Sequence, residues 1–150
     1  MLDNLLKSNI AIVGGGNFCK KLLQLLFSEP FEDYHPTVLG VADVDNQAVG
    51  RVLAELLRIF NTTDYREIYD YNDLQIFLEL TPDVEFGSII NIEKTAGVEL
   101  IDNEKARSVW SALRVEAEKK IALKELRINS LKETKVDQLF ERFADRLAGV

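Results

Sequence analysis

The sequence of 150 residues is poor in the residue types that build covalent and metal-bound sites. It has one cysteine, Cys19, and one histidine, His35. A single thiol cannot form an intramolecular disulfide, and we therefore expect a cytoplasmic protein. Because the Cys, His, Asp and Glu residues match neither zinc-ligand spacing nor a calcium-binding loop, we predict no metal site.

Long hydrophobic runs are also missing. No uninterrupted apolar segment reaches the ~20 residues that a membrane-spanning helix needs. The N-terminal residues lack the basic-then-apolar order of a secretory signal, so we expect no membrane association. The motifs of serine hydrolases and P-loop nucleotidases are absent too. We predict no catalytic residues, and an enzyme is the less favoured reading.

Basic charge is scarce over most of the chain. Residues 1–102 carry 7 Lys and Arg against 17 Asp and Glu, which gives −10. Residues 103–150 carry 11 against 8, which gives +3, with the two signs mixed along the chain. An acidic first part repels a polyanion, and we therefore expect no binding to nucleic acid.

Glycine is concentrated where it carries the most information. Residues 10–19 read Ile-Ala-Ile-Val-Gly-Gly-Gly-Asn-Phe-Cys, an apolar run that ends in Gly14, Gly15 and Gly16 before a helix-like segment. A strand, a glycine turn and a helix in this order are typical of a dinucleotide-binding unit. The N–H groups of the helix start would then face a phosphate. A tight turn without a ligand is the alternative.

Alternating apolar and helical segments predict an α/β fold with a parallel sheet in residues 1–102. The expected strand order is 3-2-1-4-5, a Rossmann-like arrangement. The expected strands cover residues 8–13, 37–42, 62–65, 74–81 and 98–101. The expected helices cover residues 17–28, 47–60 and 84–93, with a brief helix near 65–69.

Polar residues follow two of these strands at the edge where ligands bind in open α/β sheets. Asp43 ends the second strand and would accept hydrogen bonds from a ribose, which favours NAD over NADP because a carboxylate repels a 2′-phosphate. Capping of the next turn is its alternative role, and it is the favoured role for Asp45 as a helix N-cap. Thr81 ends the fourth strand and would contact ligand or cap a helix.

Three further residues have competing interpretations. His35 is placed in a loop at the opposite edge of the sheet, where a catalytic role is not expected. Cys19 is interpreted as a small packing residue rather than a redox thiol, although helix N-termini lower thiol pKa values. Glu79, the polar residue of a buried strand, would satisfy a nearby donor or reach the ligand pocket.

The last third of the chain has a different character. Residues 103–148 contain neither proline nor glycine and are rich in strong helix formers. Their apolar residues follow irregular spacings of three and four, which favours helical association without a sustained heptad. Asn129, Ser130 and Thr134 leave open a break into two helices. Residues 103–150 are therefore predicted to be a helical extension for dimerisation or signalling, in which Trp110 anchors a helix contact.

Residues 10–19, 38–45, 62–65, 78–81 and 98–102 together resemble a Rossmann-like NAD(P)-binding module. The pattern is most similar to the modules that precede PAS and histidine-kinase regions in bacterial signalling proteins. It resembles more distantly the nucleotide-binding domains of dihydrodipicolinate reductases and homoserine dehydrogenases. The resemblance implies that Gly14, Gly16, Asn17 and Phe18 lie near a pyrophosphate and Asp43 near the adenine ribose.

Three functions follow as hypotheses. The leading one is a non-catalytic NAD(H)-binding or sensing module that forms a homodimer through residues 103–148 and signals to a downstream domain or partner protein. The second is a small NAD(P)-dependent oxidoreductase, or a subunit of one. The third is a nucleotide-free scaffold, in which Phe18 fills the space above Gly14–Gly16. The expected cofactor-binding residues are Gly14, Gly15, Gly16, Asn17, Phe18, Asp43 and Thr81.

Overall fold

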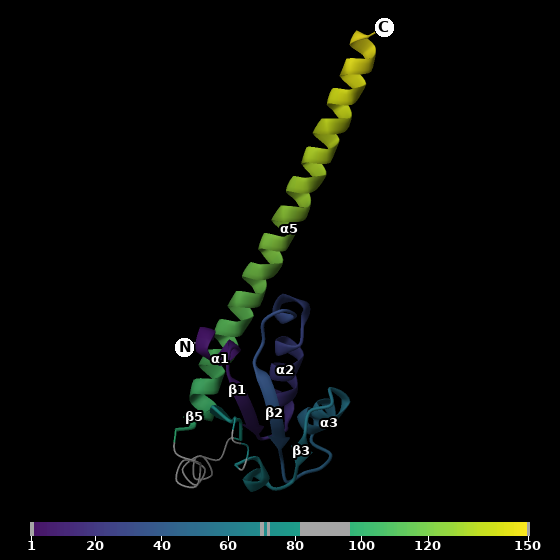
Figure 1. Cartoon of the computed structure of the whole chain (residues 1–150). Coiled ribbons are helices and arrows are strands. Elements are labelled where there is room, and N and C mark those ends of the chain that lie inside the picture. Colours follow the sequence, from purple (N-terminus) through teal and green to yellow (C-terminus); the bar gives the residue numbers. More distant parts are fainter. Residues whose placement is uncertain (1, 70, 72, 82–96, 150) are drawn as a thin grey trace. The chain divides into compact units, whose positions relative to one another are not determined.

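The computed structural model describes residues 2–69, 71, 73–81 and 97–149 (Figure 1). The chain divides into two compact units, Met1–Arg114 and Val115–Val150. The first unit contains the sheet, the short helices and the first turns of the C-terminal helix. The second unit is the remainder of that helix.

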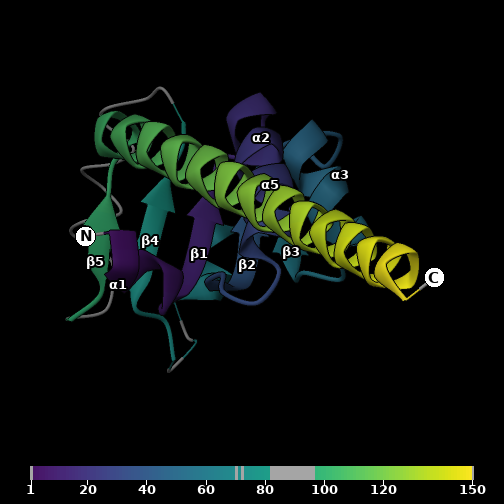
Figure 2. The ribbon, with the colours of Figure 1, turned by 90° about the horizontal axis from the view of Figure 1, so that it is seen from above.

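A five-stranded sheet forms the centre of the first unit, and all of its strand pairs are parallel. The strand order is β3-β2-β1-β4-β5, which Figure 2 shows along the sheet. The predicted α/β class and strand order are therefore confirmed. The strands are β1 (Asn9–Val13), β2 (Thr37–Ala42), β3 (Asn61–Thr62), β4 (Ile76–Glu79) and β5 (Glu99–Ile101).

The third strand is shorter than expected because Asp64 starts a new element. Its carboxylate accepts the Arg66 N–H at 3.0 Å and caps a 3₁₀ helix, η2 (Tyr65–Ile68). A residue that caps a helix cannot continue a strand ladder, since its side chain competes for the local backbone. The strand predicted over residues 62–65 therefore ends at Thr62.

Two helices near the sheet, α2 (Asn17–Leu26) and α3 (Val49–Leu56), begin close to their predicted starts. The sequence did not reveal α1 (Leu2–Leu6) or the short η1 (Glu29–Phe31). The helix predicted over residues 47–60 ends early because Arg58 adopts a left-handed backbone with φ of 61°. The helix predicted over residues 84–93 lies outside the described residues.

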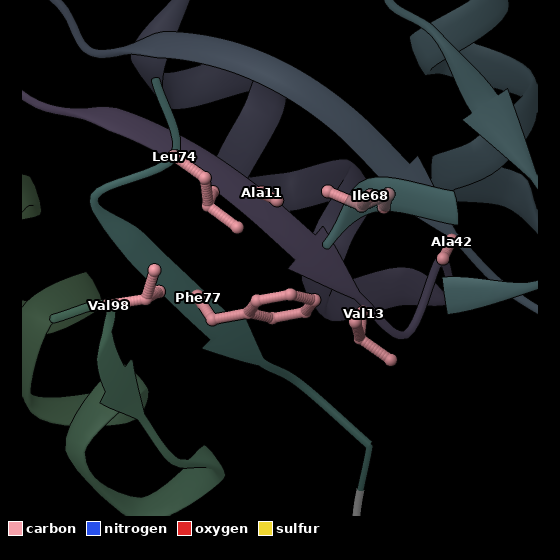
Figure 3. Close-up of a cluster of buried hydrophobic side chains, with 7 residues drawn as sticks. All are labelled: Ala11, Val13, Ala42, Ile68, Leu74, Phe77 and Val98. Atoms are coloured by element: carbon pink, nitrogen blue, oxygen red, sulfur yellow. The ribbon is translucent and has the colours of Figure 1, made fainter. Parts of the chain in front are cut away.

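One face of the sheet carries a cluster of buried side chains around Phe77 (Figure 3). Alternate residues of a strand point to the same face, so Ala11 and Val13 of β1 both reach this cluster. Burial of its larger members, such as Phe77 and Leu74, contributes ~1.5–3 kcal/mol each. The cluster thereby fixes the carboxyl ends of β1 and β2. Its members are Ala11, Val13, Ala42, Ile68, Leu74, Phe77 and Val98.

The C-terminal helix, α5 (Asn103–Ala148), is continuous over both units. In the first unit its buried residues are Ala106, Val109 and Leu113. The alternative of a break near residues 129–135 is not observed, because the polar side chains there are exposed and stay hydrated. Thr134 also donates its hydroxyl to the Ser130 carbonyl at 3.0 Å, a bond that a helix interior accommodates.

In the second unit α5 leaves many apolar side chains in solvent. Successive residues of a helix are about 100° apart around its axis. Six of these apolar side chains therefore fall on one side of α5, and each is at least 40% exposed. We call this set the tail stripe; it consists of Ile121, Ile128, Val136, Leu139, Phe143 and Leu147. Among the described residues, no helix is long and apolar enough to cross a bilayer.

Candidate functional site

The glycine turn begins at Gly14, a position that only glycine can occupy without strain. Gly14 has a φ of 100°, in the left-handed region that L side chains avoid. A Cβ at this position would lie 2.9 Å from the backbone nitrogen of Thr81. The Gly14 N–H donates to the Ala42 carbonyl at 2.8 Å. Gly14 therefore closes the turn against β2 and the end of β4.

Both backbone polar groups of Gly15 are bonded inside the protein. Its N–H donates to Oδ2 of Asp43 at 2.7 Å. Its carbonyl accepts the N–H groups of Gly50 at 2.6 Å and Arg51 at 3.2 Å, at the start of α3. The carbonyl thus satisfies two of the donors that a helix leaves open at its N-terminus. The middle of the turn is fixed by α3 on one side and by Asp43 on the other.

This fixed carbonyl decides where the next N–H points. A trans peptide is planar, so the Gly16 N–H points opposite to the Gly15 carbonyl and therefore away from α3. A Cβ on Gly16 would meet no atom within 4 Å, and Gly16 and Asn17 are both exposed. No acceptor among the described residues meets the N–H groups of Asn17 and Phe18 at the start of α2. These donors are available to an anion, as expected for a helix N-terminus.

Beside the turn lies a cavity of ≈ 230 Å³ at the carboxyl ends of the strands. Its surface is mostly apolar, and Val44 on its wall is 86% exposed. Thr63 and Tyr65 close the side next to β3. The lining residues are Val13, Gly14, Ala42, Asp43, Val44, Thr63, Tyr65 and Thr81.

Asp43 connects the turn to this cavity. One carboxylate oxygen accepts the Gly15 N–H, and the other accepts the Asp45 N–H at 2.8 Å. A carboxylate has about four acceptor positions, so two remain after these bonds. Asp43 therefore holds the following turn, as its alternative reading proposed, and keeps acceptor capacity beside the cavity.

Thr81 lines the cavity and is held in place by Glu79. The Thr81 N–H donates to Oε1 of Glu79 at 2.6 Å, and the Thr81 hydroxyl bonds to the same oxygen. Glu79 is 2% exposed and does not line the cavity. Its carboxylate holds the end of β4, which agrees with the structural interpretation of this residue. Thr81 lines the cavity, and its alternative role as a helix cap concerns residues outside the described ranges.

Cys19 packs between α2 and α3 and has no exposed surface. A Cβ added to Gly50 would lie 2.7 Å from the Cβ of Cys19, so the two helices touch here. Burial, and secondarily the charge of Asp43, raises the pKa of Cys19 to about 12. The thiol therefore stays protonated near neutral pH, and the redox alternative does not apply.

Two other polar residues have local roles. His35 precedes β2 at the edge opposite the cavity, and its ring lies 4.9 Å from that of Phe27. Asp45 accepts the Gln47 N–H at 2.9 Å in the turn before α3. Because α3 starts only at Val49 with Ala48 as its N-cap, the prediction that Asp45 caps this helix is wrong.

Apart from Phe18 and from Gly15, whose N–H and carbonyl are both bonded inside the protein, the predicted binding residues fall into two neighbouring groups. Gly14, Asp43 and Thr81 line the cavity, whereas Gly16 and Asn17 present open backbone at the start of α2. The cavity residues Val44, Thr63 and Tyr65 were not predicted from the sequence. Their positions within three residues of the ends of β2 and β3 are the signal that could have revealed them, since ligands bind beyond the carboxyl ends of strands.

The Phe18 ring points toward α5 and not into the cavity. It packs edge-on against Trp110 of α5, with ring centroids 6.2 Å apart and an interplanar angle of 77°. Phe18 is not among the residues that line the cavity. The Trp110 side chain therefore makes a helix contact within the first unit, as the sequence predicted.

Comparison with known proteins gives no family. No family model matches the chain, and no curated protein shows significant similarity to it. Within residues 2–69, 71, 73–81 and 97–149, no group of three or more His, Cys, Asp or Glu side chains could hold a metal ion. A function must therefore be argued from the turn, the cavity and the helix that follows them.

Proposed function

We propose that the protein is a non-catalytic NAD(H)-binding module that signals through a dimer of its C-terminal helix. The observation that carries this proposal is the meeting of three features at one sheet edge. They are the open backbone of Gly16 and Asn17, the carboxylate of Asp43 and the apolar cavity. The first suits a phosphate, the second a ribose and the third a flat base.

The cavity is of a size to hold one nucleoside of a dinucleotide rather than the whole molecule. Pockets that enclose whole drug-sized ligands measure ~300–1,000 Å³, whereas this one has ≈ 230 Å³. A nucleoside in the cavity would place its phosphates next to Gly14 and the start of α2. The exposed Val44 and the ring of Tyr65 offer apolar surface to a base.

The charge at the cavity favours NAD over NADP. Asp43 has two acceptor positions left for the hydroxyls of a ribose, and its negative charge repels a 2′-phosphate. Arg51, the nearby cation, donates to the Asp43 carbonyl at 3.3 Å and to Oδ1 of Asn61 at 3.0 Å. Two of its five guanidinium donors are therefore bonded within the protein, on the side of Asn61 and the Asp43 backbone.

Binding without turnover fits the groups at hand. In the described lining, Asp43 and Tyr65 are the ionisable side chains, and both Asp43 oxygens hold backbone N–H groups. Proton transfer by Asp43 would loosen the turn that binds the phosphate.

Association through the second unit supports a signalling role. The tail stripe runs along one side of α5 over residues 121–147, and every member is at least 40% exposed. Exposed apolar side chains that recur along one side of a helix favour association with another surface. A second copy of the same helix offers a matching apolar stripe, and a two-fold dimer is the commonest closed assembly.

Calorimetry with NAD⁺, NADH and NADPH tests the ligand. We expect saturable binding of NAD⁺ and NADH, and weaker binding of NADPH. The matched variant is Gly16→Ala, because its methyl group meets no protein atom and would occupy the path of a phosphate. We expect at least a tenfold loss of affinity with an unchanged circular dichroism spectrum.

The outcomes separate the three hypotheses. No heat from any nucleotide at millimolar concentration would leave the nucleotide-free scaffold. Oxidation of bound NADH in the presence of a partner chain would favour the oxidoreductase subunit.

Sedimentation equilibrium tests the dimer. We expect the double variant Leu139→Ser and Phe143→Ser to be monomeric where the parent chain is dimeric, since both residues belong to the tail stripe. Glu133→Gln, an exposed change outside the stripe, is the control and should remain dimeric. A parent chain that is monomeric at high micromolar concentration contradicts this part of the proposal.

A further inference from the structure

The start of α5 contacts both parts of the candidate site, the end of β4 beside the cavity and the start of α2. Asn103, its first residue, donates its side-chain amide to the Leu80 carbonyl at 3.0 Å. Leu80 precedes Thr81, which lines the cavity. Two turns further on, Trp110 packs against Phe18, which follows the open backbone of Gly16 and Asn17.

The Phe18–Trp110 contact differs from the other contacts that hold the first turns of α5 against the first unit. Ala106, Val109 and Leu113 are almost fully buried and belong to the core of the first unit. Phe18 and Trp110 are only half-buried, so their rings have room to change their packing. An edge-on aromatic pair is a weak contact compared with the burial of core side chains, so a ligand that fixes Phe18 can shift it.

We infer that the Phe18–Trp110 contact couples the occupancy of the nucleotide site to the association of α5. This inference depends on the proposed function. An anion bound by the N–H groups of Asn17 and Phe18 fixes the first turn of α2 and with it the Phe18 ring. Trp110 responds because it is the partner of that ring, and α5 continues from it as an unbroken helix to Ala148.

The physical requirement is a difference in affinity between two states. NAD⁺ can change the dimer only if it binds more tightly when Phe18 has one packing on Trp110 than when it has the other. The coupling is reciprocal, so the dimer must also change the affinity for NAD⁺ by the same factor. Typical couplings between sites correspond to factors of about 5–150.

The chain provides a direct reporter, because Trp110 is its single tryptophan. We expect NAD⁺ to change the emission of Trp110 and to alter hydrogen exchange of the amides of residues 103–114. We also expect it to change the dimer dissociation constant at least fivefold. Calorimetry on the same sample measures binding independently of all three.

The variant Trp110→Leu removes the aromatic contact while leaving the binding turn intact. We expect it to bind NAD⁺ but to show the same dimer dissociation constant with and without ligand. Trp110→Phe restores an aromatic ring and should regain part of the coupling. Ser111→Ala changes an exposed neighbour on α5 and should couple like the parent chain.

Three results would overturn the inference. If the parent chain gives no heat with NAD⁺, the proposed function and the coupling fail together. If it binds NAD⁺ with no change in emission, hydrogen exchange or dimer constant, the coupling fails and the proposed function stands. Equal coupling in Trp110→Leu and the parent chain assigns the signal to another contact. Should Trp110→Leu not fold, the hydrogen-exchange result on the parent chain decides.

Discussion

Gly14 and Gly16 are two residues apart in one turn, yet the structure uses them in opposite ways. Gly14 is enclosed by the end of β4, and a methyl group there would lie 2.9 Å from a backbone nitrogen. Gly16 faces open space, where a methyl group would touch nothing. The fold requires glycine at position 14. At position 16 a larger residue would fit the described structure, so packing does not explain the second glycine.

This difference explains why a glycine motif alone is weak support for a binding site. A position that is glycine for packing reasons carries no information about a ligand. A position that is glycine without a packing reason needs another explanation, and close approach of a ligand to the backbone supplies one. The contrast can be tested by changes on each side of the turn.

The largest effect is expected on the enclosed side. Gly14→Ala forces an L residue to a φ of 100° and presses its methyl group against Thr81. Left-handed strain and overpacking together should destabilise the protein by about 3 kcal/mol. Urea unfolding followed by circular dichroism measures the change. A loss below 1 kcal/mol would show that the end of β4 yields easily.

An intermediate effect is expected from Cys19, which packs behind the enclosed side of the turn. Its pKa is raised from 9.0 to about 12, so the unfolded chain loses this proton at a lower pH than the folded protein. The stability that the neutral thiol contributes is complete below pH 9 and is lost as pH rises toward 12. The free energy of unfolding should fall by about 1 kcal/mol between pH 9 and pH 10, where the thiol of the unfolded chain is partly ionised.

The control for this pH dependence is Cys19→Ala, which lacks the thiol. Urea unfolding at pH 8, 9 and 10 on both proteins isolates its contribution from that of the tyrosines and lysines. Parallel pH profiles would show that the thiol ionises normally in the folded protein.

The smallest effect on stability is expected on the open side. Gly16→Ala should change the free energy of unfolding by less than about 0.5 kcal/mol, as surface substitutions do. The same substitution should lower nucleotide affinity at least tenfold, so its effect on binding should exceed its effect on stability. A loss of stability equal to that of Gly14→Ala would remove the distinction between the two halves of the turn.

Local patterns were sufficient to predict much of the first unit. The strand at residues 37–42 is found as expected, since its apolar run is bounded by a proline-containing loop and by Asp43. The strand order followed from the alternation of strands and helices, which restricts the possible crossovers. The errors lie where one side chain starts a new element, as Asp64 does for η2, or where a non-glycine residue turns left-handed, as Arg58 does.

The candidate site was only partly predictable for the same reason. Gly14, Asp43 and Thr81 could be placed at one sheet edge because the carboxyl ends of parallel strands meet there. Their separate tasks could not, because the Gly15–Asp43 bond and the Gly15–Gly50 bond join segments far apart in the chain. Tyr65 was missed as a cavity residue even though the brief helix predicted near residues 65–69 is present as η2, because spacing along the chain does not say which side of the sheet edge this helix faces.

The sequence by itself determined the class of fold, the strand order and the helical character of residues 103–148, since periodicity and the distribution of glycine and proline act locally; whether those residues form one helix or two was left open and the structure gives one. Only the tertiary structure decided which glycines are enclosed, that Cys19 is an inert packing residue, and that Phe18 faces Trp110. Those outcomes depend on distances between segments that folding brings together, and no spacing along the chain encodes them directly.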